Sequence, residues 1–400
     1  MTESEAWARA AGRPLRVLHC PWNIAGQSAE LAAAERSLGA DSRCVVIEET
    51  AIGFPADERL MAPGGGVVAR ESARWRLLWR AMTWADVVHF SFGQSCLVPH
   101  AFPSLRSFNW LNPARAVWRL YARAVWLKDL PLLARLGRKL VVTWQGDDAR
   151  QSDRSLELFA WSLASELGDE YYVPNSDHWK RRTIDTFARY VPVQYALNPD
   201  LLHVLPRSAR FMPYASLDPA RVTWLPPPAD TTRPVAFAHA PSHRGAKGTK
   251  YVLAAAERLR AEGIDFTLDL VEGISRQQAM QRYAKADVII DQLIAGWYGG
   301  LGVEAMALGK PLVSFIRQGD LVALAPKMRS ELPVLSATPE SIAEAMKQII
   351  AMPRHDLQAW GQRSRSFVEH WHSPRKIASQ TLADYVRVHG ATGPPTATGI

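Results

Sequence analysis

A basic loop containing two glycines lies between two regular elements in the second half of the chain. Residues 239–249 read His-Ala-Pro-Ser-His-Arg-Gly-Ala-Lys-Gly-Thr, after an apolar run at Val235–Ala238 and before a helical pattern at Thr249–Leu259. Gly245 and Gly248 allow a close backbone approach, and the N-terminus of the following helix favours negative charge. The segment supplies two cations, Arg244 and Lys247, and Lys250 follows it directly. This pattern predicts a phosphate or diphosphate site, with an ordinary solvated basic loop as the alternative.

A second glycine-rich segment leads to a glutamate further along the chain. Residues 287–291 read Asp-Val-Ile-Ile-Asp, residues 299–304 read Gly-Gly-Leu-Gly-Val-Glu, and an apolar run follows at Leu312–Ile316. This order predicts a strand, a glycine loop, a helix and another strand. Glu304 falls about one turn into the helix, opposite apolar neighbours, so we expect its carboxylate to face the loop and accept hydrogen bonds from two hydroxyls. The alternative is a first-turn acid that only interacts with the helix macrodipole.

These two motifs resemble the donor-binding half of family 4 retaining glycosyltransferases. The matching residues are Arg-Gly-x-Lys-Gly-Thr at 244–249, Ala-Asp at 286–287 and Glu-Ala-Met-Ala-Leu-Gly-Lys-Pro at 304–311. The resemblance implies an α/β chain with the GT-B fold, in which two Rossmann-like doubly wound domains face a cleft. It also implies that the loop cations hold the diphosphate of a sugar nucleotide and that Glu304 binds the ribose hydroxyls. We therefore assign donor binding to Gly245, Lys250, Asp291, Gly300 and Glu304.

One element of the family pattern is absent. The family carries a second glutamate eight positions before the first, touching the transferred sugar, and Gly296 stands there in this sequence. Asp291 can substitute for it only if the intervening loop folds back. The resemblance assigns catalysis chiefly to Arg244 and Lys247, which would stabilise the charge of the departing diphosphate without a metal.

The first half of the chain alternates predicted strands with helical segments. Such alternation is typical of a doubly wound sheet, whose ligands bind beyond the carboxyl ends of the strands. Gly26 follows the first strand, where the resembled family brings its backbone close to the donor phosphate or the acceptor; the alternative is a simple turn glycine. The predicted strands are Leu15–Cys20, Cys44–Ile47, Val87–Phe90, Leu140–Trp144 and Glu170–Val173.

An acidic turn follows the fourth of these strands. Residues 145–148 read Gln-Gly-Asp-Asp, where many relatives have His-Gly-x-Asp, so Asp148 matches the aspartate and Gln145 replaces the histidine. Asp148 is therefore a candidate for orienting an acceptor hydroxyl in catalysis. The alternative is that the two adjacent aspartates only cap and begin a helix.

Length and composition agree with two globular domains. The chain has 400 residues and is 48% apolar, enough for two separate cores. We predict an acceptor-binding domain at 1–215, a nucleotide-sugar-binding domain at 216–372, and at 373–400 a helix returning to the first domain followed by a flexible tail. The sequence predicts no signal peptide and no membrane span, and its three cysteines lack metal-ligand spacing. We therefore expect free thiols and a cytoplasmic protein.

The segment from Arg74 to Lys139 is rich in arginine and tryptophan. A helix predicted to begin at Asn112 and Pro113 places three arginines on one stripe, and a second such segment covers residues 74–84. The stripe consists of Arg115, Arg119 and Arg123. Together with the net charge of +8, this favours an anionic membrane surface, with a solvated helix face as the alternative. No nucleic-acid-binding motif is present, so we expect no nucleic-acid partner.

We therefore expect a transferase that moves a sugar from a nucleotide diphosphate sugar to an acceptor hydroxyl with retention. The donor is a substrate, a UDP-sugar slightly favoured over a GDP-sugar, and no further cofactor is expected. A glycan or lipid-linked acceptor is expected, which would place the protein in the cytoplasm or peripherally on the inner face of the membrane. Two alternatives stay open: an epimerase or phosphorylase on the same fold, and a non-catalytic basic adaptor for a membrane or nucleic acid.

Overall fold

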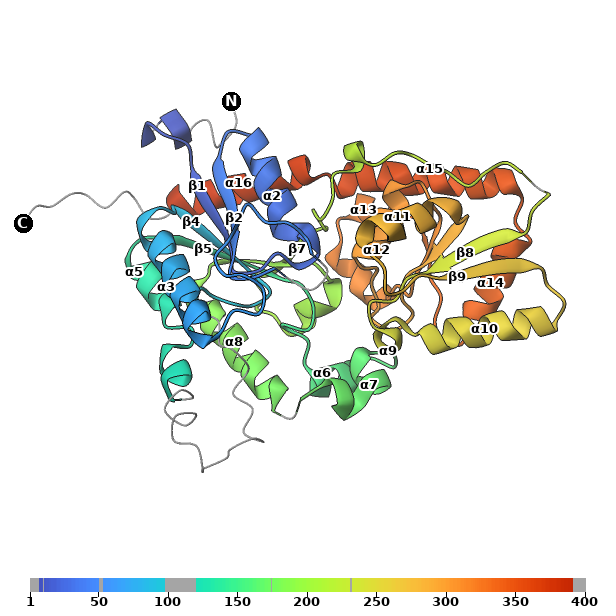
Figure 1. Ribbon diagram of the computed structural model, residues 1–400, viewed down its shortest axis with the longest axis horizontal. Coiled ribbons are helices and arrows are strands. Elements are labelled where there is room, and N and C mark those ends of the chain that lie inside the picture. The colour runs from blue at the N-terminus through green and yellow to red at the C-terminus, as the bar shows by residue number, and fades with distance from the viewer. Residues whose placement is uncertain are drawn as a thin grey trace, which may run out of the picture. The chain divides into compact units, whose positions relative to one another are not determined.

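The chain folds into two compact units (Figure 1). The computed structural model describes residues 7–9, 11–49, 53–97, 120–173, 175–230 and 232–390. Unit 1 comprises Met1–Gln151, Val173–Ser216 and Pro374–Ile400, and unit 2 comprises Ser152–Tyr172 and Leu217–Ser373. The contacts of residues 152–172 thus group this segment with unit 2, whereas the sequence suggested that it belongs with the first half of the chain.

Unit 1 is built on a seven-stranded parallel sheet with the order β3-β2-β1-β4-β5-β6-β7. Its first six strands have the Rossmann order, in which the strand sequence reverses beside β1. Strands β1, β4 and β5 are almost entirely buried, because helices cover both faces of the sheet. The strands are β1 Arg16–Cys20, β2 Asp41–Val46, β3 Glu58–Arg59, β4 Val87–Ser91, β5 Lys139–Trp144, β6 Val193–Ala196 and β7 Arg210–Phe211.

Helices surround this sheet and close the core of unit 1. Leucine, valine and phenylalanine side chains of the strands meet apolar side chains of α3, α5 and α8 in one buried cluster. The helical elements are η1 Ile24–Gly26, α2 Gln27–Ser37, α3 Val67–Thr83, α5 Asp129–Arg135, α8 Ser176–Tyr190, η3 Pro199–His203 and α16 Pro374–Gly390.

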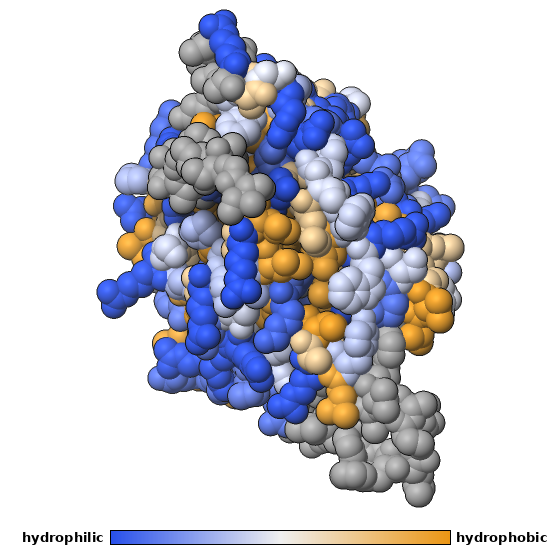
Figure 2. Space-filling model, turned by 90° about the vertical axis from the view of Figure 1, so that its left-hand side faces the viewer, coloured by the Kyte–Doolittle hydropathy of each residue, from blue (hydrophilic) through white to orange (hydrophobic). Residues whose placement is uncertain are grey.

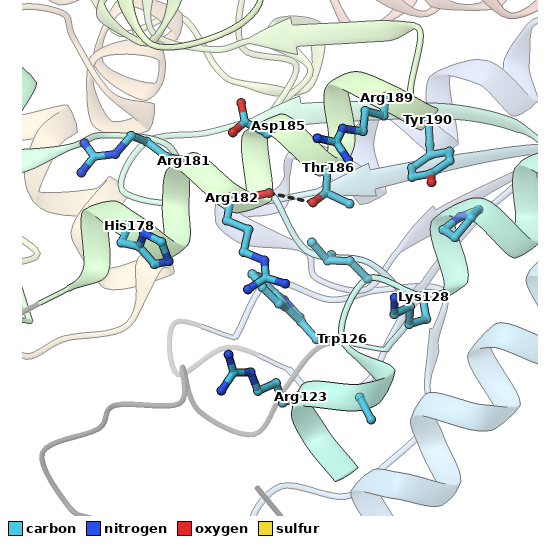
Figure 3. Close-up of a pocket in the computed structure, with 13 residues that line it drawn as sticks. Arg123, Trp126, Lys128, His178, Arg181, Arg182, Asp185, Thr186, Arg189 and Tyr190 are labelled. Atoms are coloured by element: carbon cyan, nitrogen blue, oxygen red, sulfur yellow. Dashed lines mark hydrogen bonds between the residues drawn. The ribbon is translucent and has the colours of Figure 1, made fainter. Parts of the chain in front are cut away.

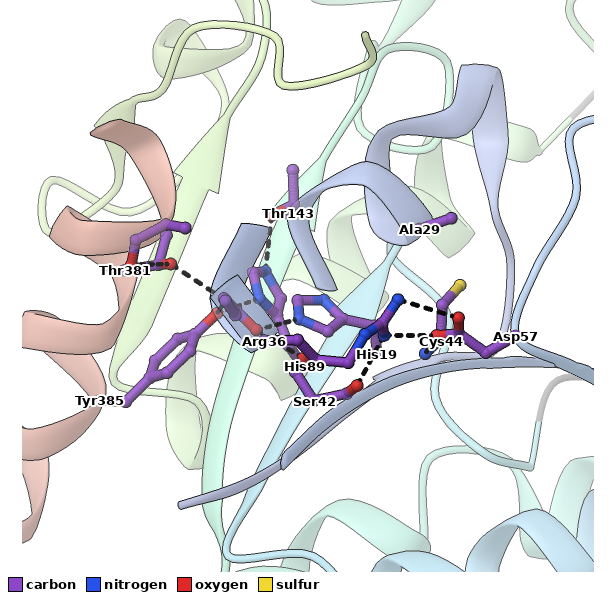
Figure 4. A network of polar contacts seen from close by, with 12 residues as sticks. His19, Ala29, Arg36, Ser42, Cys44, Asp57, His89, Thr143, Thr381 and Tyr385 are labelled. Atoms are coloured by element: carbon purple, nitrogen blue, oxygen red, sulfur yellow. Dashed lines mark hydrogen bonds and ion pairs between the residues drawn. The ribbon is translucent and has the colours of Figure 1, made fainter. Parts of the chain in front are cut away.

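A buried polar network fixes the C-terminal helix α16 on unit 1 (Figure 4). The hydroxyl of Tyr385 donates to Oε1 of Glu35 at 3.0 Å and lies 2.6 Å from Nδ1 of His89. Thr381 donates to the same carboxylate oxygen at 3.1 Å, and Nε2 of His19 lies 2.8 Å from its other oxygen. Because a buried carboxylate is costly without partners, these bonds explain why a helix distant in sequence docks on α2 and β5.

Unit 2 contains a five-stranded parallel sheet with the order β12-β11-β10-β8-β9. The chain forms β8 and β9 first and then continues on the other side of β8, so the strand order reverses between β8 and β10. Ligands of open α/β sheets bind beyond the carboxyl ends of the strands at such a reversal. The strands are β8 Val235–His239, β9 Phe266–Leu270, β10 Val288–Ile290, β11 Leu312–Val313 and β12 Val334–Leu335.

The helices of unit 2 include two short ones from the 152–172 segment. Apolar faces of α10 and α14 close the core against the sheet, and α12 packs on the long helix α15. The helical elements are α6 Ser152–Leu158, α7 Leu163–Tyr171, η4 Pro219–Arg221, α9 Arg244–Lys247, α10 Thr249–Ala261, α11 Arg276–Lys285, α12 Gly300–Ala307, η5 Gln318–Ala323, α13 Pro326–Glu331, α14 Ile342–Ile350 and α15 Arg354–Trp371.

The strand predicted at Glu170–Val173 is wrong. Helix α7 continues to Tyr171, and Tyr172 is buried in a small cluster with Leu163 and Ile294. A short aromatic run satisfies either a strand or one side of a helix, and only the tertiary contacts decide between them.

Candidate functional site

The loops after β8 and β10 leave unit 2's sheet at the same edge. The two strands pair in parallel, with His239 opposite Ile290. The buried imidazole of His239 lies 2.9 Å from the carbonyl oxygen of Ile290 through Nδ1 and 2.9 Å from Oγ1 of Thr249 through Nε2. Burial lowers the pKa of His239, so the neutral ring predominates. This side chain fixes the start of α10 against β10.

The basic loop folds as the four-residue helix α9 joined to α10 by Gly248. Nδ1 of His243 accepts a hydrogen bond from the amide of Ala246 at 3.1 Å and so caps α9. Gly248 has a φ of +72°, and a Cβ there would lie 3.2 Å from Cβ of Leu293. The left-handed backbone and the close neighbour explain why glycine is needed between the two helices.

Lys247 and Asp291 bring the two loops together. Nζ of Lys247 donates to Oδ1 of Asp291 at 2.7 Å, and the amide of Gly299 donates to Oδ2 at 2.7 Å. The Asp291 carboxylate is fully buried, while the Lys247 side chain is 14% exposed. The chain between Asp291 and Gly299 therefore does fold back over the carboxylate. Asp291 thus orients both the Lys247 ammonium and the loop backbone.

The other two predicted cations have separate carboxylate partners. Nε and Nη2 of Arg244 donate to the two oxygens of Glu272 at 2.8 and 2.6 Å, which raises the pKa of Arg244. Lys250 forms an ion pair with Glu166 of α7, whose other oxygen accepts from the hydroxyl of Tyr251 at 2.9 Å. The side chains of Arg244 and Lys250 are 61% and 64% exposed. Both cations thus remain available to a solvent-borne anion.

Gly245 of α9 packs against helix α7. A Cβ at Gly245 would overlap Cδ2 of Leu167 on α7. Its lack of a side chain therefore serves the packing of α7 against α9, a role that the loop motif alone did not indicate.

Glu304 lies on the first turns of α12, which begins at Gly300. Its Oε1 accepts from Nε of Arg276 at 2.5 Å, and its side chain is 15% exposed. Burial raises the pKa of Glu304, Arg276 opposes this shift, and the nearby charge of Asp291 adds to it. No hydrogen bond to the second carboxylate oxygen is present among the described residues. The sequence did not identify Arg276 as its partner.

Gly296, which stands where the resembled family has a second glutamate, packs against Arg317 of unit 2. Gly296 has a φ of +83°, and a Cβ there would lie 2.6 Å from Cζ of Arg317. Arg317 donates to Asp320 and to the carbonyl oxygen of Trp161, each at 2.9 Å, and its Cζ lies 3.7 Å from the ring centroid of Phe159. A larger side chain at position 296 would displace this guanidinium.

Asp148 closes the turn that follows β5 in unit 1. Its Oδ1 accepts from the amides of Gln145 at 3.1 Å and Gly146 at 2.6 Å, and Oδ2 lies 3.1 Å from the Gln145 amide. Burial raises the pKa of Asp148 to about 6, against the effect of these amides. The carboxylate therefore holds its own turn, and its titration lies near the range used by general acids and bases.

Gly26 ends the loop after β1 and precedes α2. It has a φ of +79°, and a Cβ there would lie 3.1 Å from the carbonyl oxygen of Ser216 and 3.0 Å from the ring of Phe54. The conformation and the tight packing both require glycine.

The arginine and tryptophan segment is only partly described. Arg115 and Arg119 lie outside the described residues, whereas Arg123 lies within them. On α3, Trp75 and Trp79 are 46% and 66% exposed, but Arg74 is fully buried and donates to the carbonyl oxygen of Leu97 at 2.8 Å. Arg74 thus belongs to the interior and not to a surface stripe. Hydrophilic side chains dominate the face drawn in Figure 2, with hydrophobic ones in small groups between them. Within the described residues, no helix combines the length and hydropathy needed to cross a bilayer.

Comparison with known proteins identifies the fold. No family model matches the sequence, and no curated protein matches it. Sucrose-phosphate synthase from Thermosynechococcus elongatus superposes with a TM-score of 0.58 at 14% identity, over 95% of this chain and 100% of the other. Anabaena HepE in complex with UDP-glucose gives 0.53 at 12% identity, over 94% and 99%. WaaG, a glycosyltransferase involved in lipopolysaccharide biosynthesis, gives 0.51 at 11% identity, over 92% and 99%. The predicted GT-B fold is confirmed.

Proposed function

We propose that this chain is a glycosyltransferase whose nucleotide-sugar donor binds at the carboxyl edge of the unit 2 sheet. The observation that carries the proposal is the junction of Lys247, Asp291 and Gly299. It fixes the Lys247 ammonium, on a side chain that is 14% exposed, where the strand order reverses between β8 and β10. That place in an open α/β sheet is where nucleotide ligands bind. The Glu304 carboxyl lies near enough to Asp291 for the charge of Asp291 to contribute to raising its pKa.

In this proposal, the diphosphate and the ribose of the nucleotide sugar each have partners at the site. Lys247 and Arg244 stabilise the negative charge that develops on the departing diphosphate, and no metal is required for this. Lys250, Gly245 and Gly300 line the diphosphate, while Glu304 accepts hydrogen bonds from the ribose hydroxyls. The carboxylate partners of the cations keep them in position until the anion arrives.

The acceptor belongs to unit 1 in this proposal. Asp148 orients the acceptor hydroxyl, Gly26 gives the backbone a close approach to the ligand, and the sugar is transferred with retention, as in family 4. HepE binds UDP-glucose and WaaG takes part in lipopolysaccharide biosynthesis. On the same fold, we propose a UDP-sugar donor and a glycan or lipid-linked acceptor, with the enzyme in the cytoplasm or peripherally on the inner face of the membrane.

A thermal-shift panel of UDP-, GDP- and ADP-sugars tests donor binding. A ligand present at about one hundred times its dissociation constant stabilises a folded protein by roughly 2.7 kcal/mol. We expect at least one nucleotide sugar to raise the melting temperature of the parent protein, and to raise that of Glu304→Gln less at the same concentration. If no nucleotide or nucleotide sugar shifts the parent, the donor-site proposal fails.

The packing of Arg317 against Gly296 favours three alternative candidates. Because Arg317 packs against Gly296, the sugar pocket differs from the family pattern, and an epimerase, a phosphorylase or a non-catalytic adaptor would also retain the phosphate cations. Incubation with the donor in the absence of acceptor separates these classes. An epimerase converts its substrate alone, a phosphorylase needs added phosphate, an adaptor leaves the donor unchanged, and a transferase turns it over only when an acceptor is added.

A further inference from the structure

A strongly basic cavity lies in unit 1 between α8 and residues 123–131 (Figure 3). Its volume is about 770 Å³, within the range typical of small-molecule sites. Asp185 is the one carboxylate among the described residues that line it. The cationic or titratable bases of the lining are Arg123, Lys128, His178, Arg181, Arg182 and Arg189.

One face of α8 supplies most of this charge. His178, Arg182, Asp185 and Arg189 follow one another at intervals of four, three and four residues, so they share a side of the helix. The opposite side, which includes Phe187, is buried in the core of unit 1. The core therefore fixes the orientation of α8 and directs its basic face into the cavity.

Four cations of this cavity have no carboxylate partner among the described residues. Arg123, Lys128, Arg182 and Arg189 form no ion pair within the part of the chain that the structure describes. Comparably exposed arginines of unit 1 do: Arg36 pairs with Asp57, and Arg59 pairs with Glu49, at 2.9 and 3.1 Å. Like charges gathered in a concave surface raise its potential and attract an anion of matching charge.

Two tryptophans position the central guanidinium. Cζ of Arg182 lies 5.5 Å from the ring centroid of Trp126 and 5.9 Å from that of Trp179. The two indoles pack edge to face, with centroids 5.1 Å apart. Cation–π contacts of this kind orient a guanidinium and leave its N–H groups free for hydrogen bonds. A planar guanidinium with free N–H groups matches two oxygens of a phosphoryl group.

We propose that this cavity is a second anion site, specific for a ligand that carries a diphosphate or two phosphoryl groups. The lining contains five arginine and lysine side chains but one aspartate among its described residues. Two phosphoryl groups together carry a charge of about −3 to −4, which balances this excess of positive charge. Leu127 and Pro131 add an apolar wall for the body of the ligand. The inference does not depend on the donor site of unit 2.

Calorimetric titration with inorganic pyrophosphate tests the site. The starting protein carries Arg244→Ala and Lys247→Ala, so that the basic loop of unit 2 does not contribute. We expect this protein to bind pyrophosphate, and the further change Arg182→Gln with Arg189→Gln to weaken binding about a hundredfold, or about tenfold for each charge-assisted pair. Arg207→Gln removes an exposed arginine of unit 1 outside the cavity and is the matched control, expected to leave the affinity unchanged.

Two results overturn the proposal. One is the absence of pyrophosphate binding in the starting protein. The other is an equal loss of affinity in the cavity variant and in Arg207→Gln, which would mean that overall charge is responsible. Thermal unfolding of each variant confirms folding, which we expect to be intact because Arg182 and Arg189 are exposed.

Sedimentation with phosphatidylglycerol vesicles distinguishes a soluble ligand from a lipid headgroup. If the phosphoryl groups belong to a lipid, the protein sediments with the vesicles, and both pyrophosphate and the change of Arg182 and Arg189 prevent this. If pyrophosphate binds in the cavity and the protein does not sediment, the ligand is soluble. The cavity has no role in vesicle binding if pyrophosphate does not compete with the vesicles and if Arg207→Gln reduces binding as much as the change of Arg182 and Arg189 does.

Discussion

The two units differ in whether their clustered basic residues have carboxylate partners. At the predicted donor site of unit 2, each cation has a carboxylate partner: Lys247 has Asp291, Arg244 has Glu272 and Lys250 has Glu166. In the cavity of unit 1, Arg182 and Arg189 have none among the described residues. The predicted acid of unit 1 differs again, because Asp148 is held by backbone amides of its own turn.

The difference separates two ways of binding an anion. A paired cation is held in one geometry before its ligand arrives, so that little reorganisation is needed when charge develops in a transition state. An unpaired cluster is not balanced by the protein and gains most from a ligand that stays bound and neutralises it. The first arrangement suits catalysis on a passing diphosphate, and the second suits recognition.

The largest effect is expected at the paired cations. Lys247→Ala should lower the turnover number for sugar transfer by about a hundredfold to a thousandfold, and Arg244→Ala by about a hundredfold, because each removes a charge that stabilises the departing diphosphate. Arg258→Ala on α10, which removes an exposed arginine paired with Glu262, is the matched control and should retain parent turnover. Steady-state release of the nucleoside diphosphate measures all three. Near-parental turnover in both loop variants would show that the pairs are merely structural.

The next largest effect concerns Asp148 and pH. Burial raises its pKa to about 6, so the folded state holds the proton more tightly than the unfolded state does. Its contribution to stability is therefore fully present below the unfolded pKa, near pH 4, and is lost as pH rises toward 6. A rise of about two pKa units corresponds to at most roughly 3 kcal/mol.

Urea unfolding at pH 4 and pH 7 measures this effect. The difference between the free energy of unfolding of the parent and that of Asp148→Asn should be smaller at pH 7 than at pH 4. All other groups titrate in both proteins, so this difference isolates Asp148. A constant difference would mean that the three amide contacts outweigh burial. If Asp148 also acts on the acceptor hydroxyl, kcat/KM has an inflection near pH 6 that Asp148→Asn lacks.

A smaller effect is expected at Glu304. Glu304→Gln should weaken nucleotide affinity about tenfold, because an amide oxygen is a poorer acceptor for ribose hydroxyls than a carboxylate. Arg276 would lose its charged partner at the same time, so Arg276→Gln serves as the comparison. Titration with UDP measures both variants. Equal loss in the two would assign the effect to the ion pair, and unchanged affinity in Glu304→Gln would exclude the ribose role.

Most strands could be predicted from the sequence, but the contacts between residues far apart in the chain could not. Strand β8 and the helix that begins at Gly300 were predicted because their signals are local: an apolar run for the strand, and glycines before an apolar helical pattern. Strand β6 was missed, since Val193–Ala196 offers only four residues, one of them the polar Gln194. The strand predicted at Glu170–Val173 is instead the end of α7, whose place is decided by packing against Ile294.

The predicted site residues were limited in the same way. The types and spacing of Arg244 and Lys247 indicated a phosphate site, and the resemblance to family 4 glycosyltransferases implied a ribose role for Glu304. Neither indicated the partners Glu272 and Arg276, each 28 residues from the group it binds. The burial of a side chain could not be predicted from the sequence either. Arg74 belongs to a basic segment of the sequence, yet its side chain lies in the interior. The partners that tune a charge are brought together only by folding.

The smallest effect, and the most direct check of the contrast between the units, is on stability. Arg189→Gln should change the free energy of unfolding by at most about 0.5 kcal/mol, and in the stabilising direction at low salt, because it removes a charge that like charges surround. Arg13→Gln is the counterpart, since Arg13 donates to both oxygens of the nearly buried Asp86 at 2.6 and 2.7 Å. We expect it to destabilise the protein by about 1 kcal/mol. Urea unfolding at low salt and at about 1 M salt, where the Debye length is short, compares them. The gain from Arg189→Gln should vanish at high salt, and a loss as large as that of Arg13→Gln would show that the cavity arginines hold the fold together and are not kept for a ligand.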